Sequence, residues 1–404
     1  MLTELLLLIK KNSGILAVIG GSLIENLFGP SLIGWGFILL GLGYEWIWPH
    51  RNYKTLPLIF FILILAAWGL LSLWVTADLD LTVPAVSRHV ASLVCFVAIV
   101  CWLKTQPDFE YFGFGLIGLG SFLSIASPFI IEFQQNKGGF IPDSFYHQLP
   151  LLLSNPVHPN IMATILLMLF PIGFVYALAC LAQPLTWKVW LAIIGTFLMM
   201  LMLFLTRSRG GYLVGGIGMV LILGALGYRK IALLGGTGVV VVVLALIAIE
   251  PASTDTAVDA LANTNTLGFR LLVWELALNI LRDFPLTGVG MGAFNVVGER
   301  LYPFPPFADP GAHNLFFQIG VDLGLPALIA YLYLTLYLVW KSRLIRIANS
   351  GDEKSLFLLG AWIGLILMLL HGLIDPTVWG TRMHIMPWFL MAFLMAKIVE
   401  GREA

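Results

Sequence analysis

The sequence has little charge for its length. Only 11% of its 404 residues are charged, whereas 59% are hydrophobic; a typical soluble domain has about 25% charged residues. A soluble protein of this size would have too few charges to cover its surface. The apolar residues also occur in runs of roughly twenty, which is the length that spans a bilayer. The composition therefore excludes a soluble enzyme and predicts an all-α membrane protein that crosses the bilayer many times.

Cysteine is scarce, and there is no net charge. Cys95, Cys101 and Cys180 lie in apolar runs without C-x-x-C spacing, so neither a disulfide framework nor a zinc site is indicated. The 22 basic residues balance the 22 acidic ones, which argues against nucleic acid as the main partner. Lys10 and Lys11 are not followed by a small-residue cleavage site, so we expect no removable signal peptide.

Hydropathy predicts about twelve membrane spans. We expect them at residues 14–28, 31–48, 55–76, 84–103, 111–131, 159–180, 187–206, 211–228, 230–249, 313–340, 355–376 and 383–398. The first is weak because Glu25 and Asn26 interrupt it. Of the two long connections, 132–158 and 250–312, only the second is large enough to form a subdomain.

The basic residues predict the orientation. We expect a bundle of about nine spans in 1–249, a helical outer loop in 250–312 and C-terminal helices in 313–404. With both termini in the cytoplasm, 14 of the 22 basic residues fall on the inner side and eight on the outer side, as the positive-inside rule requires. Both long connections are then outside, facing the periplasm if the membrane is a bacterial inner membrane.

The outer basic residues are mostly arginine. Seven of the eight are arginines, whereas nine of the 14 inner ones are lysines, and six of the seven histidines also lie at outer ends. Guanidinium binds phosphate bidentately and tolerates partial burial better than ammonium does. The bias predicts an outer site for an anionic, phosphate-bearing ligand. The alternative is that these side chains reach lipid headgroups and have no further role.

The segment Thr206-Arg207-Ser208-Arg209-Gly210-Gly211 is a candidate phosphate site. Ser208 is expected to cap the helix that follows, and the glycines allow another group to approach the backbone closely. A helix N-terminus beside two arginines suits a phosphate. The alternative is a tight turn flanked by membrane-surface arginines.

The large outer loop contains a second candidate. Residues 270–283 read as a helix that Pro285 ends, and Arg270 falls among its apolar positions, where a cation should seek a buried anion. We expect the apolar stripe of this helix to comprise Leu271, Trp274, Leu278 and Leu281. The glycines at 288, 290 and 292 follow no strand, so a nucleotide-binding loop is not indicated.

Two further groups carry histidine. His313-Asn314 opens the tenth expected span, and we expect His313 to share a helical stripe with Phe317, Gly320 and Gly324. His371 and Asp375 are spaced i, i+4 and lie close to Arg382. A structural role is the alternative for both groups.

Three acidic features are ambiguous. Asp78-Leu-Asp80 has the spacing of a metal-binding D-x-D, but chance produces such pairs readily. Glu25 and Asp322 fall within expected spans, where an acidic residue is suspected of function. Neighbouring helices could equally satisfy both.

The order TRSRGG, then R-x3-W with PLTGVGMGAF, then AHNLFFQIGVDLGLPAL resembles the O-antigen ligase and O-antigen polymerase superfamily, best over residues 155–376. The resemblance implies a GT-C type glycosyltransferase that moves a glycan from a polyprenyl (undecaprenyl) diphosphate to a glycolipid or glycan acceptor. Transfer would occur outside the inner membrane, in lipopolysaccharide or surface polysaccharide synthesis, without metal or cofactor. Arg207 or Arg209 would match the family's arginine after the corresponding span, Arg270 its loop arginine and His313 its loop-end histidine.

These assignments predict a chemistry. Arginines would neutralise the diphosphate leaving group, and His313 would take a proton from the acceptor hydroxyl. We expect the diphosphate to contact Arg207, Arg209, Arg270 and Arg382, supported by Asn314, Ser208, Gly210, Trp274, His371 and Asp375. Ligase and polymerase differ only in the acceptor, and a single large outer loop favours the ligase. A small-anion (for example bicarbonate) transporter and a non-catalytic scaffold are the alternatives of another class.

Overall fold

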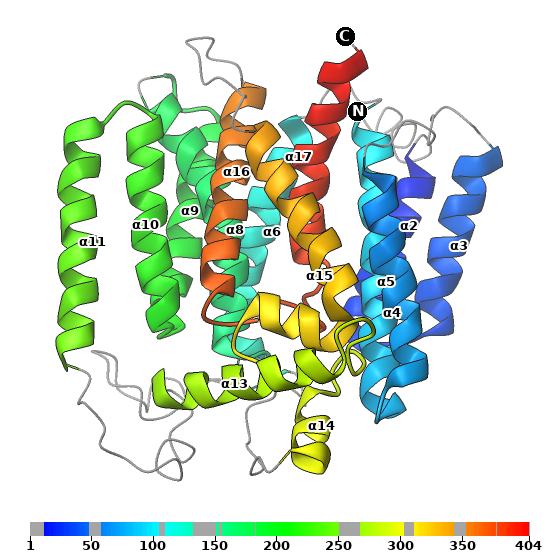
Figure 1. Ribbon diagram of the computed structural model, residues 1–404. Coiled ribbons are helices and arrows are strands. Elements are labelled where there is room, and N and C mark those ends of the chain that lie inside the picture. The colour runs from blue at the N-terminus through cyan, green and yellow to red at the C-terminus, as the bar shows by residue number, and fades with distance from the viewer. Residues whose placement is uncertain are drawn as a thin grey trace. The chain divides into compact units, whose positions relative to one another are not determined.

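The computed structural model describes residues 12–47, 58–104, 110–131, 151–152, 156–181, 183–249, 267–302, 311–342, 353–376 and 378–403. Within these ranges the regular structure is helical, apart from one isolated bridge between Ile131 and Val157 (Figure 1). The three cysteines are buried and free.

Contacts divide the chain into two compact units. Unit 1 is Met1–Pro107, Asp255–Leu338 and Val378–Ala404, and unit 2 is Asp108–Thr254 and Val339–Thr377. The units interleave along the chain. The three sequential parts expected above, which are defined by their relation to the membrane, stay a prediction.

The helices of each unit are as follows. Unit 1 contains α2 (Ser13–Phe28), α3 (Leu32–Ile47), α4 (Ile59–Val75), α5 (Leu79–Leu103), α13 (Leu267–Asp283), α14 (Phe294–Leu301), α17 (Met386–Glu403) and most of α15 (Leu315–Ser342). Unit 2 contains α6 (Glu110–Ile130), α8 (Pro159–Cys180), α9 (Trp187–Leu205), α10 (Arg209–Ala225), α11 (Arg229–Ile249) and α16 (Glu353–Gly372).

Every expected span coincides with one of these helices. Six described helices, α5, α6, α8, α9, α15 and α16, are long and apolar enough to cross a membrane. Helices α2, α3, α4, α10 and α17 are also apolar but shorter. The protein is therefore a multi-pass helical membrane protein, and the total of twelve spans stays a prediction.

The first span is weak as expected, because α2 is among the shorter apolar helices, but the expectation that Glu25 and Asn26 interrupt it is wrong. Glu25 and Asn26 lie inside a continuous α2 and are fully buried. Asn26 Nδ2 donates to the Ser22 carbonyl at 2.9 Å, and Glu25 accepts from the amide and hydroxyl of Ser31 at 2.9 and 2.8 Å. The helix continues through them because each polar group has a partner.

Close helix packing depends on small residues in both units. A Cβ at Gly21 of α2 would lie 2.5 Å from the Gly34 carbonyl of α3. In unit 2, a Cβ at Gly364 of α16 would collide with the Met168 carbonyl of α8. Without a hydrophobic driving force between helices in lipid, such close approach is a principal source of association.

The polar residues of unit 2 gather at the two ends of α8. Near its N-terminus, Asn160 Nδ2 donates to Asp375 at 2.6 Å. Near its C-terminus, the Tyr176 hydroxyl and Lys188 each donate to Glu353, both at 2.8 Å. We expected Asp375 outside and Lys188 inside, so this separation agrees with the alternating topology; the membrane side of each end stays a prediction.

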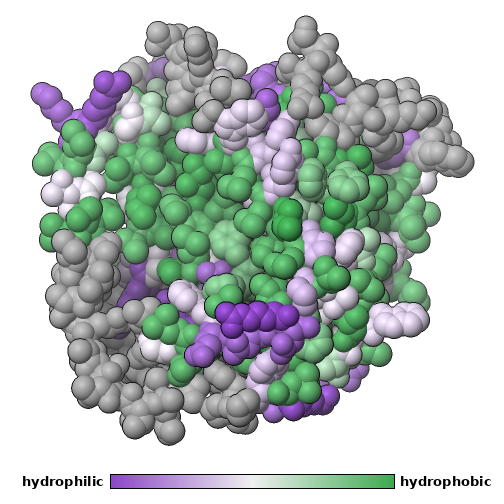
Figure 2. Space-filling view, viewed as in Figure 1, coloured by the Kyte–Doolittle hydropathy of each residue, from purple (hydrophilic) through white to green (hydrophobic). Residues whose placement is uncertain are grey.

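The loop helix α13 crosses the direction of α4, α5 and α15 in unit 1 (Figure 1). It ends at Asp283, two residues before Pro285, as expected. Hydrophobic side chains cover much of the visible helical surface, whereas hydrophilic ones gather over α13 (Figure 2). Its exposed polar residues include Glu275, Arg282 and Asp283.

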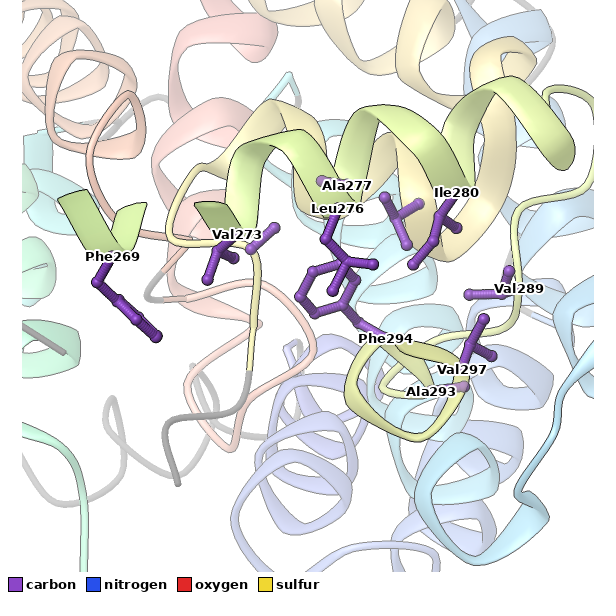
Figure 3. Packing of buried hydrophobic residues seen from close by; sticks show 11 residues of the cluster. Phe269, Val273, Leu276, Ala277, Ile280, Val289, Ala293, Phe294 and Val297 are labelled. Carbon is purple, nitrogen blue, oxygen red and sulfur yellow. The ribbon is translucent and has the colours of Figure 1, made fainter. Parts of the chain in front are cut away.

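The buried face of α13 differs from the expected stripe. Its buried residues are Phe269, Val273, Leu276, Ala277 and Ile280, which pack with Phe294 and Val297 of α14 (Figure 3). Leu271 is 53% and Leu278 39% exposed, so the stripe predicted from Leu271, Trp274, Leu278 and Leu281 is wrong. Helical periodicity is compatible with both the predicted stripe and the observed one. Only the tertiary contacts determine which of the two is buried.

Helix α15 is broken at Gly324, which has φ +80°. The break leaves two carbonyls without helical donors, because Pro326 has no N–H and the Leu325 amide donates instead to the Pro285 carbonyl at 2.7 Å. The amides of Val289 and Gly290 fill these positions, donating to the Val321 and Asp322 carbonyls at 2.8 and 3.1 Å.

The glycines of the loop permit this close pairing. A Cβ at Gly288 would lie 2.5 Å from the Val321 carbonyl, and one at Gly324 would lie 2.6 Å from the Leu286 carbonyl. The glycine-rich loop is therefore a docking element for the broken helix, in keeping with the rejection of a nucleotide-binding loop.

Candidate active site

His313 lies in a strained turn, outside the helix. It has φ +46°, in the left-handed region that non-glycine residues rarely adopt. Helix α15 begins at Leu315, and Asn314 caps it, because its Oδ1 accepts from the amides of Phe316 and Phe317 at 2.9 and 3.1 Å. The expectation that His313 shares a helical stripe with Phe317, Gly320 and Gly324 is wrong.

Gln318 and Asp322 hold this turn. The Ala312 amide donates to Gln318 Oε1 at 2.7 Å, and Gln318 Nε2 donates to Asp322 Oδ1 at 2.9 Å. Asp322 also accepts from the Gly292 amide at 3.3 Å and from Trp379 Nε1 at 3.0 Å. One buried carboxylate thus ties together the glycine loop, the His313 turn and the turn before α17.

Helix α13 contacts the same region through Phe269 and Trp274. The ring of Phe269 packs edge-on against His313 with centroids 5.4 Å apart, and Trp274 lies 6.0 Å from Phe317. Arg270 Nε and Trp274 Nε1 are buried without a hydrogen-bond partner. Buried donors are nearly always satisfied, so these two are available to a ligand that brings acceptors.

The end of α13 is fastened to the end of α14. The Tyr302 hydroxyl donates to Asp283 Oδ2 at 2.5 Å. Burial, together with this bond, raises the pKa of Tyr302 above its ordinary value, so the hydroxyl stays protonated and keeps donating. This contact holds the two loop helices together.

The Arg207 turn in unit 2 is strained as well. Arg207 has φ +53° and is half-buried. Ser208 caps α10 as predicted, because its hydroxyl accepts from the Gly211 amide at 3.2 Å. Arg209 is the first residue of α10 and is exposed. Leu58, Arg207 and His313 are the non-glycine residues with positive φ in the described part of the chain, so two of three are predicted site residues.

His371 and Asp375 lie against the same turn in unit 2. A Cβ at Gly210 would lie 3.2 Å from His371 Nε2, which confirms the close approach expected of this glycine. His371 Nδ1 bonds the Thr164 hydroxyl at 2.8 Å, and Asp375 accepts from Asn160. Helix α16 ends at Gly372, before Asp375.

The other acidic candidates have structural partners. Asp78 caps α5, accepting from the amides of Asp80 and Leu81 at 2.9 and 3.3 Å. Glu25 and Asp322 are satisfied by neighbouring segments. The described residues contain no group of three His, Cys, Asp or Glu side chains that could hold a metal ion.

Sequence reasoning missed several residues of these sites. Gln318, Phe269 and Trp379 hold or contact the His313 turn, and Asn160 and Thr164 hold Asp375 and His371. The one usable signal was spacing, because Gln318 and Asp322 are four residues apart on a helix. The remaining contacts join segments far apart in the sequence.

Helices of membrane length and two polar turns rich in arginine and histidine define a class: a multi-pass membrane protein that carries candidate anion sites. Residues 194–332 match the family model described as O-Antigen ligase. The match covers about a third of the chain, from α9 into α15, and over this part the chain is similar to the O-antigen ligase family. No curated protein matches the chain. The matched region includes Arg207, Arg270 and His313, whereas His371, Asp375 and Arg382 lie beyond it.

Proposed function

We propose that the protein transfers a glycan from a polyprenyl diphosphate, such as undecaprenyl diphosphate, to an acceptor at the outer face of the bacterial inner membrane. The reaction would be of the O-antigen ligase type, metal-independent and inverting, in lipopolysaccharide or surface polysaccharide synthesis. The observation that carries the proposal is the left-handed His313 turn with the unpartnered donors of Arg270 and Trp274 on the adjacent helix.

In this proposal the donor diphosphate binds at Arg270. A guanidinium forms paired hydrogen bonds with phosphate oxygens, and Arg270 Nε is buried without a partner. Charge neutralisation lets the diphosphate leave without a metal ion. Arg207 and Arg209, which the family match includes, are candidates for phosphate binding in unit 2. Arg382 is a further candidate.

His313 acts as the base or orients the acceptor. A single displacement at the anomeric carbon requires a hydroxyl that loses its proton as the bond to the diphosphate breaks. The buried network through Gln318 and Asp322 keeps the His313 turn in one conformation, which suits a group that must be aimed. One displacement inverts the configuration of the sugar. The polyprenyl tail would lie between helices in the lipid, as in GT-C enzymes.

Two alternatives predict different results. A polymerase of the same superfamily would use a second lipid-linked glycan as the acceptor. A small-anion transporter would use a broken helix to bind its substrate, and α15 is broken. Its freed carbonyls, however, accept from Val289 and Gly290, so the break offers a substrate little backbone to bind.

The test uses the purified full chain, a lipid-linked glycan and an acceptor in the presence of a chelator. We expect His313→Ala and Arg270→Ala each to lower the transfer rate by about 10²-fold or more. Arg282→Ala is the matched control, because Arg282 is exposed on the same helix, and it should retain activity.

Three outcomes would contradict the proposal. Full activity in both His313→Ala and Arg270→Ala would contradict the proposed mechanism. A strict requirement for a divalent metal would bring Asp78 and Asp80 back into consideration. Bicarbonate uptake into liposomes without a glycan donor would favour transport. Exchanging lipid A core for a second lipid-linked glycan as the acceptor distinguishes ligase from polymerase.

A further inference from the structure

A buried pair of imidazoles joins α5 to the turn of residues 378–385 before α17, in unit 1. His89 of α5 is 0% and His384 of the turn 1% exposed. The two rings share a hydrogen bond between His89 Nδ1 and His384 Nε2 at 3.0 Å. The proposed transfer reaction uses neither side chain, so the pair has no assigned role in that chemistry.

The surrounding groups fix the proton on each ring. His89 Nε2 lies 3.1 Å from the Leu65 carbonyl, which can only accept, so this nitrogen carries a proton. His384 Nδ1 accepts from the Gly380 amide at 3.1 Å and therefore carries none. His384 Nε2 then holds the proton of a neutral ring and donates it to His89 Nδ1. The indole N–H of Trp388, 3.4 Å from His384 Nε2, lies beyond the usual hydrogen-bond length.

This arrangement accommodates two protons on the pair. A third could enter only at His89 Nδ1 or at His384 Nδ1, the two ring nitrogens that accept. At His89 Nδ1 it would face the N–H of His384, and at His384 Nδ1 it would face the Gly380 amide. Either position sets two buried donors against each other, which removes a hydrogen bond and leaves the groups unsatisfied. A protonated pair is therefore incompatible with the observed turn.

The basic groups around the pair oppose a further positive charge. Arg88 precedes His89 on α5, interacts electrostatically with His384 and donates to the Gly380 carbonyl at 3.2 Å. Arg382 lies in the same turn and interacts electrostatically with Arg88. Like charges repel in partly buried surroundings. Helix α4 contributes the Leu65 carbonyl and has no titratable side chain.

The acids of the neighbouring helices bond other groups. Glu25 of α2 accepts from two serine side chains and a backbone amide. Asp322 of α15 accepts from the three donors described above. The other ring partners are Tyr331 of α15, which packs edge-on against Trp379 at 5.6 Å, and Trp388 of α17. These contacts give an imidazolium at the pair no carboxylate partner among the described residues.

Trp379 connects the pair to the network that holds the His313 turn. Its ring packs against both imidazoles, with centroids 5.2 Å from that of His89 and 4.9 Å from that of His384. Its indole N–H donates to Asp322 at 3.0 Å. The same carboxylate accepts from the side chain that fixes the start of the His313 turn. A displacement of the imidazoles therefore reaches the turn through one aromatic ring and one carboxylate.

We propose that the neutral His89–His384 pair positions the His313 turn through Trp379 and Asp322, and that a third proton on the pair releases this turn. The inference rests on the proposed function, because it takes the His313 turn to be catalytic. His89 and His384 are thus positioning residues. Acid lowers the transfer rate by releasing the turn, in addition to any protonation of His313 itself.

The proton arrangement is tested on the purified full chain in detergent by NMR of ¹⁵N-labelled histidine, with His89→Gln and His384→Asn for assignment. At about pH 7.5 we expect both rings to be neutral, each with its proton on Nε2. Below the ordinary histidine pKa of about 6.5, the unfolded chain gains protons that the folded pair does not accommodate, so the midpoint of thermal unfolding should fall with pH. The fall should be smaller in His384→Asn, whose side-chain oxygen can still accept from Gly380 but takes no proton. If that variant does not fold, His89→Gln decides, because its amide nitrogen can still donate to Leu65.

The coupling is tested with Trp379→Phe, which keeps an aromatic ring but loses the donation to Asp322. We expect the His313 resonance to move, kcat to fall about tenfold and KM to change less than about twofold, the effect of losing one hydrogen bond to a charged group. Trp362→Phe is the matched control, because the Trp362 indole donates to the Val339 carbonyl at 2.8 Å within unit 2. It should leave the His313 resonance and kcat nearly unchanged.

The outcomes separate this inference from the proposed function. An imidazolium at about pH 7.5, or a proton on His384 Nδ1, overturns the inference. Equal acid-induced falls of the midpoint in the parent and His384→Asn overturn the role of the third proton. A His313 resonance that does not move in Trp379→Phe overturns the coupling. If the parent transfers no glycan but this resonance moves as expected, the proposed function fails and the link between the pair and the turn stands.

Discussion

Two charged residues of unit 1 have buried polar atoms but differ in whether those atoms have hydrogen-bond partners. Asp322 is 1% exposed and accepts from three donors, the Gln318 amide group, the Gly292 backbone and the Trp379 indole. Arg270 is half-buried, and its Nε has no partner. A saturated buried group stabilises the fold, whereas an unsaturated one lowers stability and is available for binding. Burial alone does not separate the two roles.

The largest expected effect comes from Asp322→Leu. The substitution strands the buried donors of Gln318 and Trp379, each costing about 1–3 kcal/mol, and removes the acceptor of the more exposed Gly292 amide, so we expect the free energy of unfolding to fall by about 2 kcal/mol or more. The measurement is the midpoint of thermal unfolding in detergent. Arg270→Leu should leave that midpoint nearly unchanged while abolishing transfer.

The comparison fails if the two variants behave alike. An Asp322→Leu protein with normal stability would show that the three donors find water or other partners. An Arg270→Leu protein that unfolds as readily as Asp322→Leu would make Arg270 a structural residue.

A smaller effect is expected from Gln318→Met. The variant keeps the side-chain volume but loses the link between the Ala312 amide and Asp322, so the His313 turn is less firmly held. We expect kcat to fall about tenfold, equivalent to about 1.4 kcal/mol, with little change in KM. The measurement is a steady-state comparison of both constants in the transfer assay.

Thr335→Val is the matched control for this variant. Thr335 is buried on the same helix, and its hydroxyl bonds the Tyr331 carbonyl at 2.9 Å, so the control also loses a buried hydrogen bond but one that does not reach the His313 turn. If both variants lower kcat equally, Gln318 has no specific positioning role.

Much of the helical framework follows from the sequence. The twelve expected spans coincide with helices, the loop helix ends where Pro285 predicts, and Ser208 caps α10. These features are local, because they depend on hydropathy, proline geometry and capping within a few residues. The position of Arg270 among apolar residues of the loop helix, together with the arginine bias, also directed attention to this residue.

The non-local features could not be predicted. The buried face of α13 depends on α14 packing against one of two apolar stripes. The left-handed conformation of His313 depends on a turn that Gln318 and Asn295 hold from separate segments, since the Gly311 amide donates to Asn295 Oδ1 at 3.3 Å. The need for glycine at 288 and 324 arises only when the glycine-rich loop packs against the break in α15.

The smallest expected effect tests whether the backbone strain at Arg207 is retained because the residue is needed for function. Arg207 holds a left-handed conformation, which costs an L-residue about 1–2 kcal/mol. Glycine adopts it freely but loses about 0.5–1 kcal/mol more entropy on folding. We therefore expect Arg207→Gly to raise the free energy of unfolding by up to about 1 kcal/mol while lowering transfer, as measured by thermal unfolding and the transfer assay.

Arg209→Gly provides the opposite control two residues away. Arg209 begins α10 in a helical conformation, where glycine costs about 0.5–1 kcal/mol, so this variant should be less stable than the parent. Opposite shifts from two neighbouring Arg→Gly substitutions would assign the difference to backbone conformation, since both remove the same charge. If Arg207→Gly is destabilising as well, the contacts of the Arg207 side chain outweigh its strain, and the left-handed turn is then part of the folded framework in the way that Asp322 is.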